Sequence, residues 1–552
     1  MKVTLLPDIP DTVLSQYSNL SPFLAKLLYN RAVHPEEVAE FLYGTDIGDP
    51  YLIPDMKAFV DRIQKAVDSD EKIMIHGDYD VDGISASAII YLYLTDVLKL
   101  HNVTVHLPDR HGDGYGLSQK TIDRCIEEGN TLLITVDCGI KDKKLVDYAI
   151  EKGIDVIVSD HHTPPDELPA SLALIHPMFY SSKNLCGAGI AWKMVQALDE
   201  AFGKDASETY VDLAGLGTIC DVMELKGENR VIVKKALQSM RKSPRIGLAA
   251  LMESARIIPH DLDTYHIGYM IGPRLNAAGR LASADASLQL LLSTEEAAAV
   301  EQAASLSTLN LRRQTETTEA MNKADAKLDP RQSIHIIYIP SVNPGVIGLV
   351  AGKLTEKTSK PVIILTDDPA AGVLVGSCRS IDEMDMTECL AAVSEHLLGY
   401  GGHKKAAGCK VHIDNLTAFT AKAEAYAKTL LGTTVSEKHI QVDIKLDLST
   451  AALAQLYKEI ELMAPFGESN PRPICISDVV IESVFTMGEN GKHMKVLLHD
   501  VNNLTPKITG VGFNMDGSQY KRGDRVEVIY TISQNIWNGR TEMQLNLIDI
   551  IK

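Results

Sequence analysis

The sequence predicts an α/β protein with a parallel-sheet domain, a long connecting helix, a second α/β domain and a C-terminal all-β barrel. Three observations predict this order. Apolar strands and helical stretches alternate from about residue 73 to 202, residues 286–329 contain neither proline nor glycine, and short strands separated by turns follow residue 438. Such alternation is typical of a parallel sheet with helices on both faces, and evenly spaced short strands are typical of a barrel.

Composition sets the first limits. The chain has 552 residues, 45% of them hydrophobic, so roughly three or four domains are expected. The start, MKVTLLPDIPD, has no basic stretch followed by an apolar one, and polar residues interrupt the longest apolar window, 84–98. We therefore expect no signal peptide, no membrane span and a cytoplasmic protein. The eight cysteines include no CxxC pair, which argues against structural zinc. The formal charge of −19 argues against non-specific coating of nucleic acid, although a local basic track remains compatible with it.

The first half reads as one domain. Residues 1 to about 50 show a mixed helical pattern, which we expect to form an N-terminal helical extension packed on the first domain. The elements then expected are strands 73–76, 103–107, 132–136, 155–159 and 172–175 and helices 83–99, 118–128, 141–152 and 187–202. In such a sheet the ligand crevice lies beyond the carboxyl ends of the strands.

The segment KIMIHGDYDVDG is the most informative part of this domain. An apolar strand stops at His76 and is followed by Asp78, Asp80 and Asp82. Three like charges repel one another unless a cation lies among them, which favours a divalent metal. In the alternative interpretation Asp82 caps the helix that follows and the other aspartates are solvated. This segment alone leaves both interpretations open.

Residues at the ends of other strands favour the interpretation as a metal site. Strand 132–136 ends at Asp137, strand 155–159 ends at Asp160, His161 and His162, and a helical segment ends near Asp221. Turn chemistry does not explain acidic and imidazole groups at three strand ends together. The candidate metal ligands are His76, Asp80, Asp82, Asp137, His161 and Asp221. Six ligands suit two ions, and oxygen with imidazole donors favours Mn²⁺, with Mg²⁺ tolerated.

The second half contains three further parts. Residues 286–330 are expected to form one long helix joining two catalytic halves, and 331–432 a second α/β domain with a glycine-rich turn, GYGGH. Residues 437–552 are expected to form an OB fold, which commonly grips single strands on aromatic side chains. Phe485, Phe513, Tyr520 and Trp537 could serve this purpose, but each could equally belong to the core.

Several motifs together resemble the DHH phosphoesterase superfamily. DYDVDG, VDCG, SDHH and the later CD pair occur in the order of its four motifs, and GSCRS and GYGGHKKAAG resemble its DHH-associated domain. IGPRLNAAGRL and APFGESNPRP are similar to a branch that digests single-stranded DNA from the 5′ end. The resemblance covers the chain from about residue 50 to the end. Residues 51–285 would form the DHH domain.

The resemblance implies roles for particular residues. His76, Asp80 and Asp137 would hold one ion, with Asp82, Asp137, His161 and Asp221 holding the other, and His162 and His403 would contact the scissile phosphate. Ser377, Arg379 and Arg110 would hold the DNA 5′-phosphate, whereas Arg274, Asn276 and Arg280 would track the strand. The sequence departs from the family pattern at Asn343, where a histidine is usual, and at Ile175 and His176, where an asparagine is usual before Pro177.

The resemblance thus implies a two-metal exonuclease specific for single-stranded DNA, acting in DNA repair and recombination as a monomer. A single-strand-binding protein or a helicase would be its protein partner. Two alternatives remain open: an oligonucleotide or cyclic-dinucleotide phosphodiesterase of the same superfamily, and a catalytically silent relative that binds single strands. The expected barrel and connecting helix favour the exonuclease, because a small substrate needs neither.

Overall fold

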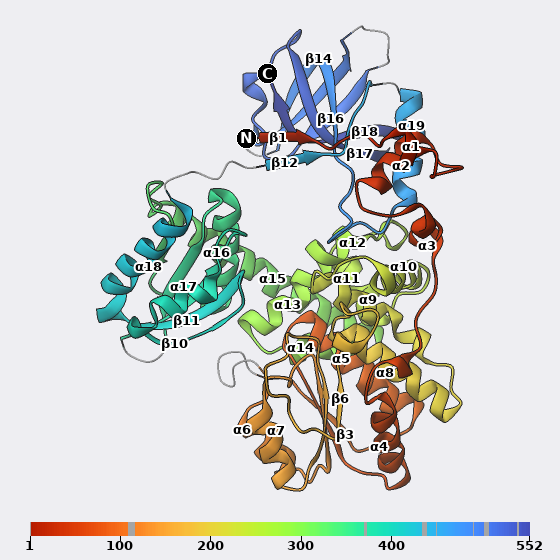
Figure 1. Ribbon diagram of the computed structural model, residues 1–552, viewed down its shortest axis with the longest axis vertical. Coiled ribbons are helices and arrows are strands. Elements are labelled where there is room, and N and C mark those ends of the chain that lie inside the picture. Colours follow the sequence, from red (N-terminus) through yellow and green to blue (C-terminus); the bar gives the residue numbers. More distant parts are fainter. Residues whose placement is uncertain are drawn as a thin grey trace.

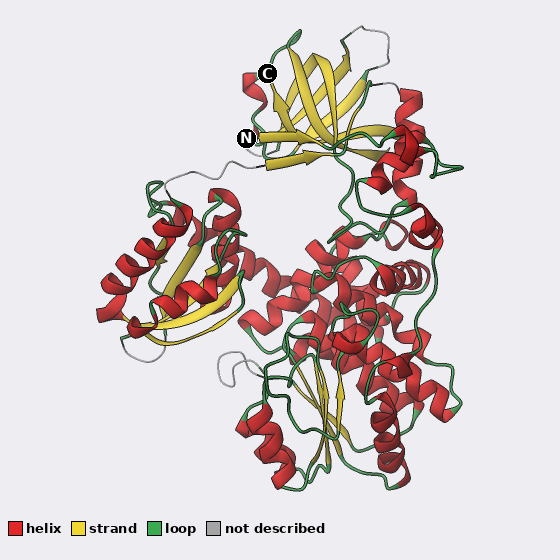
Figure 2. Cartoon of the chain, in the orientation of Figure 1, coloured by secondary structure: helices red, strands yellow, loops and turns green. Residues whose placement is uncertain are grey.

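The computed structural model describes residues 2–108, 116–368, 372–432, 439–448, 450–488, 491–501, 507–537 and 540–552. Two α/β parts lie side by side, joined by a long helix, and a β-barrel lies beyond the helical layer of the first part (Figure 1). Helices surround both α/β sheets, whereas the barrel consists mostly of strands (Figure 2). Among the described residues, no helix combines the length and apolar character that crossing a bilayer requires.

The first part contains the expected parallel sheet. Its strand order is β3-β2-β4-β5-β6. These strands are β2 (Ile73–Gly77), β3 (Val103–His106), β4 (Leu132–Val136), β5 (Asp155–Ser159) and β6 (Ala173–Ile175). All pairings are parallel, and chain order reverses between β2 and β4. A reversal of this kind opens a crevice at the carboxyl ends of the two strands.

Helices cover both faces of this sheet. One face packs against α4 (Met56–Asp68), α5 (Val81–Leu92) and α8 (Gly187–Phe202). The other face packs against α6 (Gln119–Glu127) and α7 (Lys143–Glu151). Alternate strand residues supply the two cores, Ile73 and Ile75 on one side and Met74 on the other, as the pleat requires.

A helical layer follows the sheet. It comprises α9 (Val211–Cys220), α10 (Gly227–Lys242), α11 (Ile246–Ser254), α12 (Thr264–His266), a π-helical turn (Ile267–Ile271) and α13 (Gly272–Leu281). The single long helix expected over 286–330 is two helices, α14 (Asp285–Leu292) and α15 (Glu296–Asp325). Ala299, Ala303 and Leu306 of α15 are buried in the first core, while Ala320 and Ala324 are buried in the second part. The connecting helix therefore belongs to both cores.

The second part has a five-stranded mixed sheet of order β10-β11-β9-β8-β7. Its strands are β7 (His335–Tyr338), β8 (Val362–Asp367), β9 (Val373–Arg379), β10 (Leu397–Gly402) and β11 (Ala406–His412). Its helices are α16 (Pro344–Thr358), α17 (Met386–Ala392) and α18 (Leu416–Leu431). The glycine-rich turn forms most of the edge strand β10.

The C-terminal part is a closed barrel, as the strand pattern predicts. Its strands are β14 (Cys475–Met487), β15 (His493–Asp500), β16 (Ile508–Gly512), β17 (Arg525–Trp537) and β18 (Arg540–Ile551). Pairing of β14 with β17 closes the ring. The short strands β12 (His439–Val442) and β13 (Ile444–Lys445) and helix α19 (Thr450–Leu462) precede it.

The N-terminal segment packs elsewhere than expected. Strand β1 (Lys2–Leu5) pairs in parallel with β12, and helix α2 (Pro22–Tyr29) buries Leu24, Leu27 and Leu28 in the core of the barrel part. The expectation that this segment packs on the first domain is therefore wrong for β1 and α2, whereas Phe41 and Gly48 further along do contact Arg230 and Glu228 of the first part. The reason is that an amphipathic helix needs an apolar surface but does not encode which domain supplies it.

Candidate metal centre

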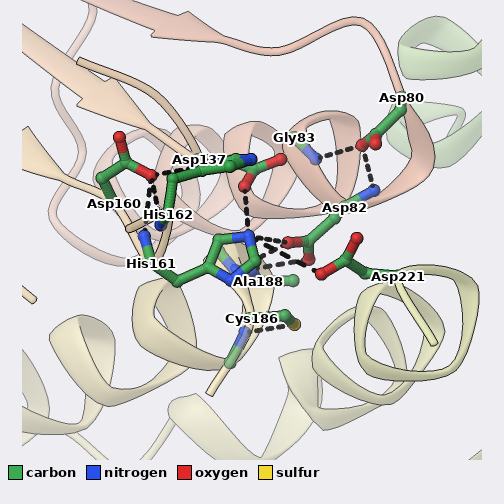
Figure 3. A network of polar contacts seen from close by, with 12 residues as sticks. Asp80, Asp82, Gly83, Asp137, Asp160, His161, His162, Cys186, Ala188 and Asp221 are labelled. Carbon is green, nitrogen blue, oxygen red and sulfur yellow. Dashed lines mark hydrogen bonds and ion pairs between the residues drawn. The ribbon is translucent and has the colours of Figure 1, made fainter. Parts of the chain in front are cut away.

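The reversal point between β2 and β4 gathers the acidic side chains. Asp80 begins helix α5, where its Oδ1 accepts hydrogen bonds from the backbone N–H of Asp82 at 2.9 Å and of Gly83 at 3.1 Å. Asp82 lies on the first turn of the same helix, and Asp137 directly follows β4 with a left-handed φ of 61°. Three carboxylates are thus positioned by two strand ends and one helix start (Figure 3).

His161 lies at the centre of these carboxylates. Its Nε2 is 3.0 Å from Asp137 Oδ1, 3.6 Å from Asp221 Oδ2 and 3.8 Å from Asp82 Oδ2. It comes from the loop after β5, and Asp221 follows the last residue of α9. Figure 3 shows the imidazole pointing into the space between the three carboxylates. Four separate segments therefore converge on one point.

The start of helix α8 orients Asp82. The N–H of Gly187 donates to Asp82 Oδ2 at 2.6 Å, and that of Ala188 donates to Oδ1 at 2.9 Å. The free N–H groups of a helix start need acceptors, so these two hydrogen bonds hold the buried side chain of Asp82 in one orientation.

The other carboxylates are in an unfavourable state without a cation. Burial, followed by the charges of Asp82, Asp80 and Asp78, raises the pKa of Asp137 well above its ordinary value. Burial and the same neighbours raise the pKa of Asp221 to about 8. A bound cation would reverse these effects by favouring the charged forms.

The donor set fits divalent cations that prefer oxygen and imidazole. Three groups of side chains each bring their ligand atoms within 4.8 Å of one another: Asp78, Asp80 and Asp137; Asp82, His161 and Asp221; and Asp137, His161 and His162. The thiols of Cys138 and Cys186 lie nearby but are absent from these groups; Cys138 donates to the His76 carbonyl oxygen, and the Cys186 sulfur accepts from the Gly189 N–H at the start of α8. Carboxylate with imidazole and no thiolate favours Mn²⁺ or Mg²⁺ over structural zinc.

Two residues differ from the expected arrangement. His76 is fully buried, and its Nε2 donates to the Gly116 carbonyl oxygen at 3.1 Å while its Nδ1 faces His106 Nδ1 at 3.2 Å. Asp78, which was not among the expected ligands, lies with Asp80 and Asp137 instead. The sequence contained a signal for Asp78, because it alternates with Asp80 and Asp82 in the same loop.

The carboxylate of Asp160, which is not among the predicted site residues, holds the imidazole of His162. Asp160 Oδ1 accepts from His162 Nδ1 at 2.8 Å, and Asp160 Oδ2 accepts from the Ile140 N–H at 2.9 Å. Burial lowers the pKa of His162, but the hydrogen bond and charge of Asp160 outweigh burial and raise it overall. The second α/β part contacts the first part here, since His403 Nε2 of the second part lies 3.5 Å from Lys141 Nζ of the first.

The residues expected to contact DNA are found in different surroundings. Arg379 Nη1 donates to Ser377 Oγ at 3.3 Å on β9, so these two are together as expected. Arg280 donates to the Gly345 carbonyl oxygen at 3.3 Å and so joins α13 to the second part. Arg274 points into the fold, where it donates to Met270 and Ser307 at 2.7 and 3.2 Å. Arg110 lies outside the described residues.

Three stretches of the chain match known protein families. Residues 72–218 match the DHH family N-terminal domain, residues 331–429 the DHHA1 domain and residues 442–549 the RecJ OB domain. A parallel sheet with carboxylates and imidazoles at its reversal point, joined to these domains, defines a metal-dependent phosphoesterase of the DHH class.

Relatives define the class further. The chain is 32% identical to the single-stranded-DNA-specific exonuclease RecJ of Bacillus subtilis (strain 168), over 97% of this chain and 69% of that protein. It is 30% identical to the Escherichia coli (strain K12) protein of the same name, over 96% of this chain and 95% of that protein. The crystal structure of RecJ from Thermus thermophilus in complex with Mn²⁺ matches with a TM-score of 0.86 and 28% identity, over 100% of this chain and 79% of that one. The chain belongs to the RecJ family.

Proposed function

We propose that this protein is a metal-dependent exodeoxyribonuclease that degrades single-stranded DNA from the 5′ end and releases mononucleotides. The convergence of Asp82, Asp137 and Asp221 on His161, in a chain of the RecJ family, carries the proposal. Bound as a pair, divalent cations would generate hydroxide near neutral pH and offset the charge that develops on the phosphate. The family membership further supports a role in DNA repair and recombination.

The side chains divide between two ions. Asp82, His161 and Asp221 would hold one, and Asp80 with Asp78 the other, while Asp137 lies near both sets and would bridge them. His76 was expected at the second ion. In the structure its Nε2 contacts the Gly116 carbonyl oxygen, and Asp78 is the residue whose carboxylate lies with those of Asp80 and Asp137.

The phosphate itself would meet cationic and hydrogen-bonding groups. His162, whose pKa Asp160 raises, would donate a proton or hydrogen bond to a phosphate oxygen. His403 and Lys141, which lie together, would approach the same phosphate. Because His403 belongs to the second part, the site is complete only when both parts are in place.

Ser377 and Arg379 would hold the 5′-phosphate of the strand. A Cβ at Gly348 would lie 3.0 Å from Ser377 Oγ and 3.2 Å from Arg379 Nη2, so α16 leaves room beside these groups only because residue 348 is a glycine. A guanidinium beside a hydroxyl suits a terminal phosphate. Arg110 is proposed for the same role from the family resemblance alone.

End-labelled DNA tests the proposal. The protein should release labelled mononucleotide from 5′-labelled single strands in Mn²⁺, leave blunt duplex intact and lose activity when Asp137 becomes Asn. Hydrolysis of dinucleotides with no cleavage of long strands would instead identify an oligonucleotide phosphodiesterase. Strand binding without any hydrolysis would identify a silent relative. We further propose that it works as a monomer in the cytoplasm and receives single strands from a single-strand-binding protein or a helicase.

A further inference from the structure

A pair of stacked tyrosines lies exposed on helix α12 and on the π-helical turn that follows it. Tyr265 and Tyr269 are 59% and 73% exposed, and their ring centroids lie 5.0 Å apart with an interplanar angle of 28°. Large exposed aromatic side chains cost solvation free energy, and two stacked together in solvent are typical of a binding surface.

The segment that carries these rings spans the distance between barrel and active site. At its start, Thr264 Oγ1 donates a 2.6 Å hydrogen bond to the carbonyl oxygen of Phe466. Phe466 lies in the connection that leads into the barrel. At its end, a Cβ at Gly279 would lie 2.7 Å from the carbonyl oxygen of Tyr79, the residue before Asp80. Helix α12 lies at the edge of the helical layer that is nearest the barrel (Figure 1). From residue 265 to 280 the segment covers roughly 20 Å at 1.5 Å per residue.

The middle of the segment packs beside a metal ligand. A Cβ at Gly272 would lie 2.6 Å from the sulfur of Cys220, which directly precedes Asp221. The buried face of this segment includes Ile267, Ile271 and Leu275. The tyrosines therefore lie on the outer face of a segment whose inner face contacts the active site.

Helical spacing places further candidate groups on the same outer face. Tyr265 and Tyr269 are four residues apart, and Pro273, Asn276 and Arg280 continue at intervals of four, three and four residues. All three of the latter are partly exposed. Residues with this spacing share one helix face, so the stripe leads from the two rings to Arg280, which bonds to the second part near the proposed 5′-phosphate site.

We propose that Tyr265 and Tyr269 form a stacking platform for bases of the DNA strand on the 3′ side of the bond that is cleaved. This inference rests on the proposed function, because the 5′ end would lie at Ser377 and Arg379, beyond the opposite end of the stripe. Aromatic rings stack on any base, so the platform holds the strand without reading its sequence.

Kinetics with strands of different length test the platform. Replacing both residues by alanine should raise the KM for long single strands about tenfold, since one stacked base contributes about a factor of 5 to 150, and should leave dinucleotide hydrolysis unchanged. Replacing both by phenylalanine keeps the rings and should preserve the KM of the wild type. Tyr43→Ala removes another exposed tyrosine, on helix α3 (Val38–Tyr43), and should have no effect.

Abasic substrates provide an independent readout. A short abasic window moved along the strand should raise the KM of the wild type at one position 3′ of the cleaved bond, and the double alanine variant should be insensitive to the window there. Equal sensitivity of both proteins to every window, or a normal KM for the alanine variant on long strands, would overturn the platform. In either case continued digestion of long strands by the wild type would leave the proposed function intact. The single variant Tyr269→Ala provides the same comparison if the double variant does not fold.

Discussion

The carboxylate of Asp160 holds the imidazole of His162 through a 2.8 Å hydrogen bond to Nδ1, and the same oxygen accepts the His161 and His162 backbone N–H groups at 2.7 and 3.0 Å. One buried carboxylate thus sets the loop that supplies both histidines. With Nδ1 bound to Asp160, Nε2 is the ring atom of His162 that would face a substrate.

Asp160→Asn should lower kcat by roughly 10–100-fold, the usual cost of removing a partner that orients an active-site imidazole. The pKa of His162 is raised by Asp160, so losing the carboxylate lowers it, and activity should fall off at a lower pH than in the wild type. The pH profile of kcat measures this shift. Asp166→Asn, an exposed change in the same loop, is the control, and an unchanged profile in Asp160→Asn would contradict the role of Asp160.

Divalent cations should stabilise the fold. In the metal-free protein a raised carboxyl pKa means that stability falls as pH rises from about 4, the unfolded value, toward the folded value. For Asp221 the folded pKa is about 8. Mn²⁺ at 100 times its apparent Kd should raise the free energy of unfolding by about 2.7 kcal/mol in total, seen as a higher Tm.

Metal affinity should depend on pH for the same reason. Asp221 holds a proton below about pH 8 in the metal-free protein, so Mn²⁺ must displace that proton. The apparent affinity should rise by up to about tenfold per pH unit between pH 6 and 8, as calorimetry would measure. Asp221→Asn should weaken binding and flatten this dependence. An affinity that does not change over this range would contradict the assignment of Asp221 as a ligand.

Arg379→Ala should abolish the preference for a phosphorylated 5′ end. The guanidinium lies beside Ser377, and removing it takes away the charge that would pair with the terminal phosphate. The ratio of kcat/KM for phosphorylated and hydroxyl-ended strands should approach one. Arg274→Ala is the matched control: Arg274 bonds within the fold, so its loss should lower Tm while the ratio stays as in the wild type. Equal losses for both end types in Arg379→Ala would argue against a phosphate site there.

Arg230→Met should loosen the junction between barrel and helical layer. The guanidinium of this buried arginine donates to the carbonyl oxygens of Phe41, Met463, Ala464 and Pro465 at 2.7 to 3.2 Å. The substitution removes all four hydrogen bonds. Asn470 still donates to the Met463 and Pro465 oxygens and Lys234 to that of Phe41, but the Ala464 oxygen loses its donor, and a single unsatisfied buried group costs about 1–3 kcal/mol. A lower Tm and faster proteolytic cleavage between the parts should result. Lys235→Met, which removes a surface pair with Glu208, should change neither measurement.

Much of the local structure and the candidate metal ligands could be predicted from the amino-acid sequence alone. Strand ends rich in Asp and His predicted Asp82, Asp137 and His161 as ligands, because a parallel sheet brings the carboxyl ends of its strands to one edge whatever the details of packing. Asp221 was predicted from its place at the end of a helix. Alternating apolar patterns also predicted the order of the parts and the barrel.

Contacts between groups that are far apart in the chain could not be predicted from the sequence and are known only from the folded structure. Asp78 lies with Asp80 and Asp137, while the buried imidazole of His76 contacts Gly116 and His106. The N-terminal helix packs on the barrel, and Arg274 turns inward. Each outcome depends on which apolar surface or polar partner lies near in space. A pattern of residue types along the chain shows that a side chain needs a partner, but it does not show which residue that partner is.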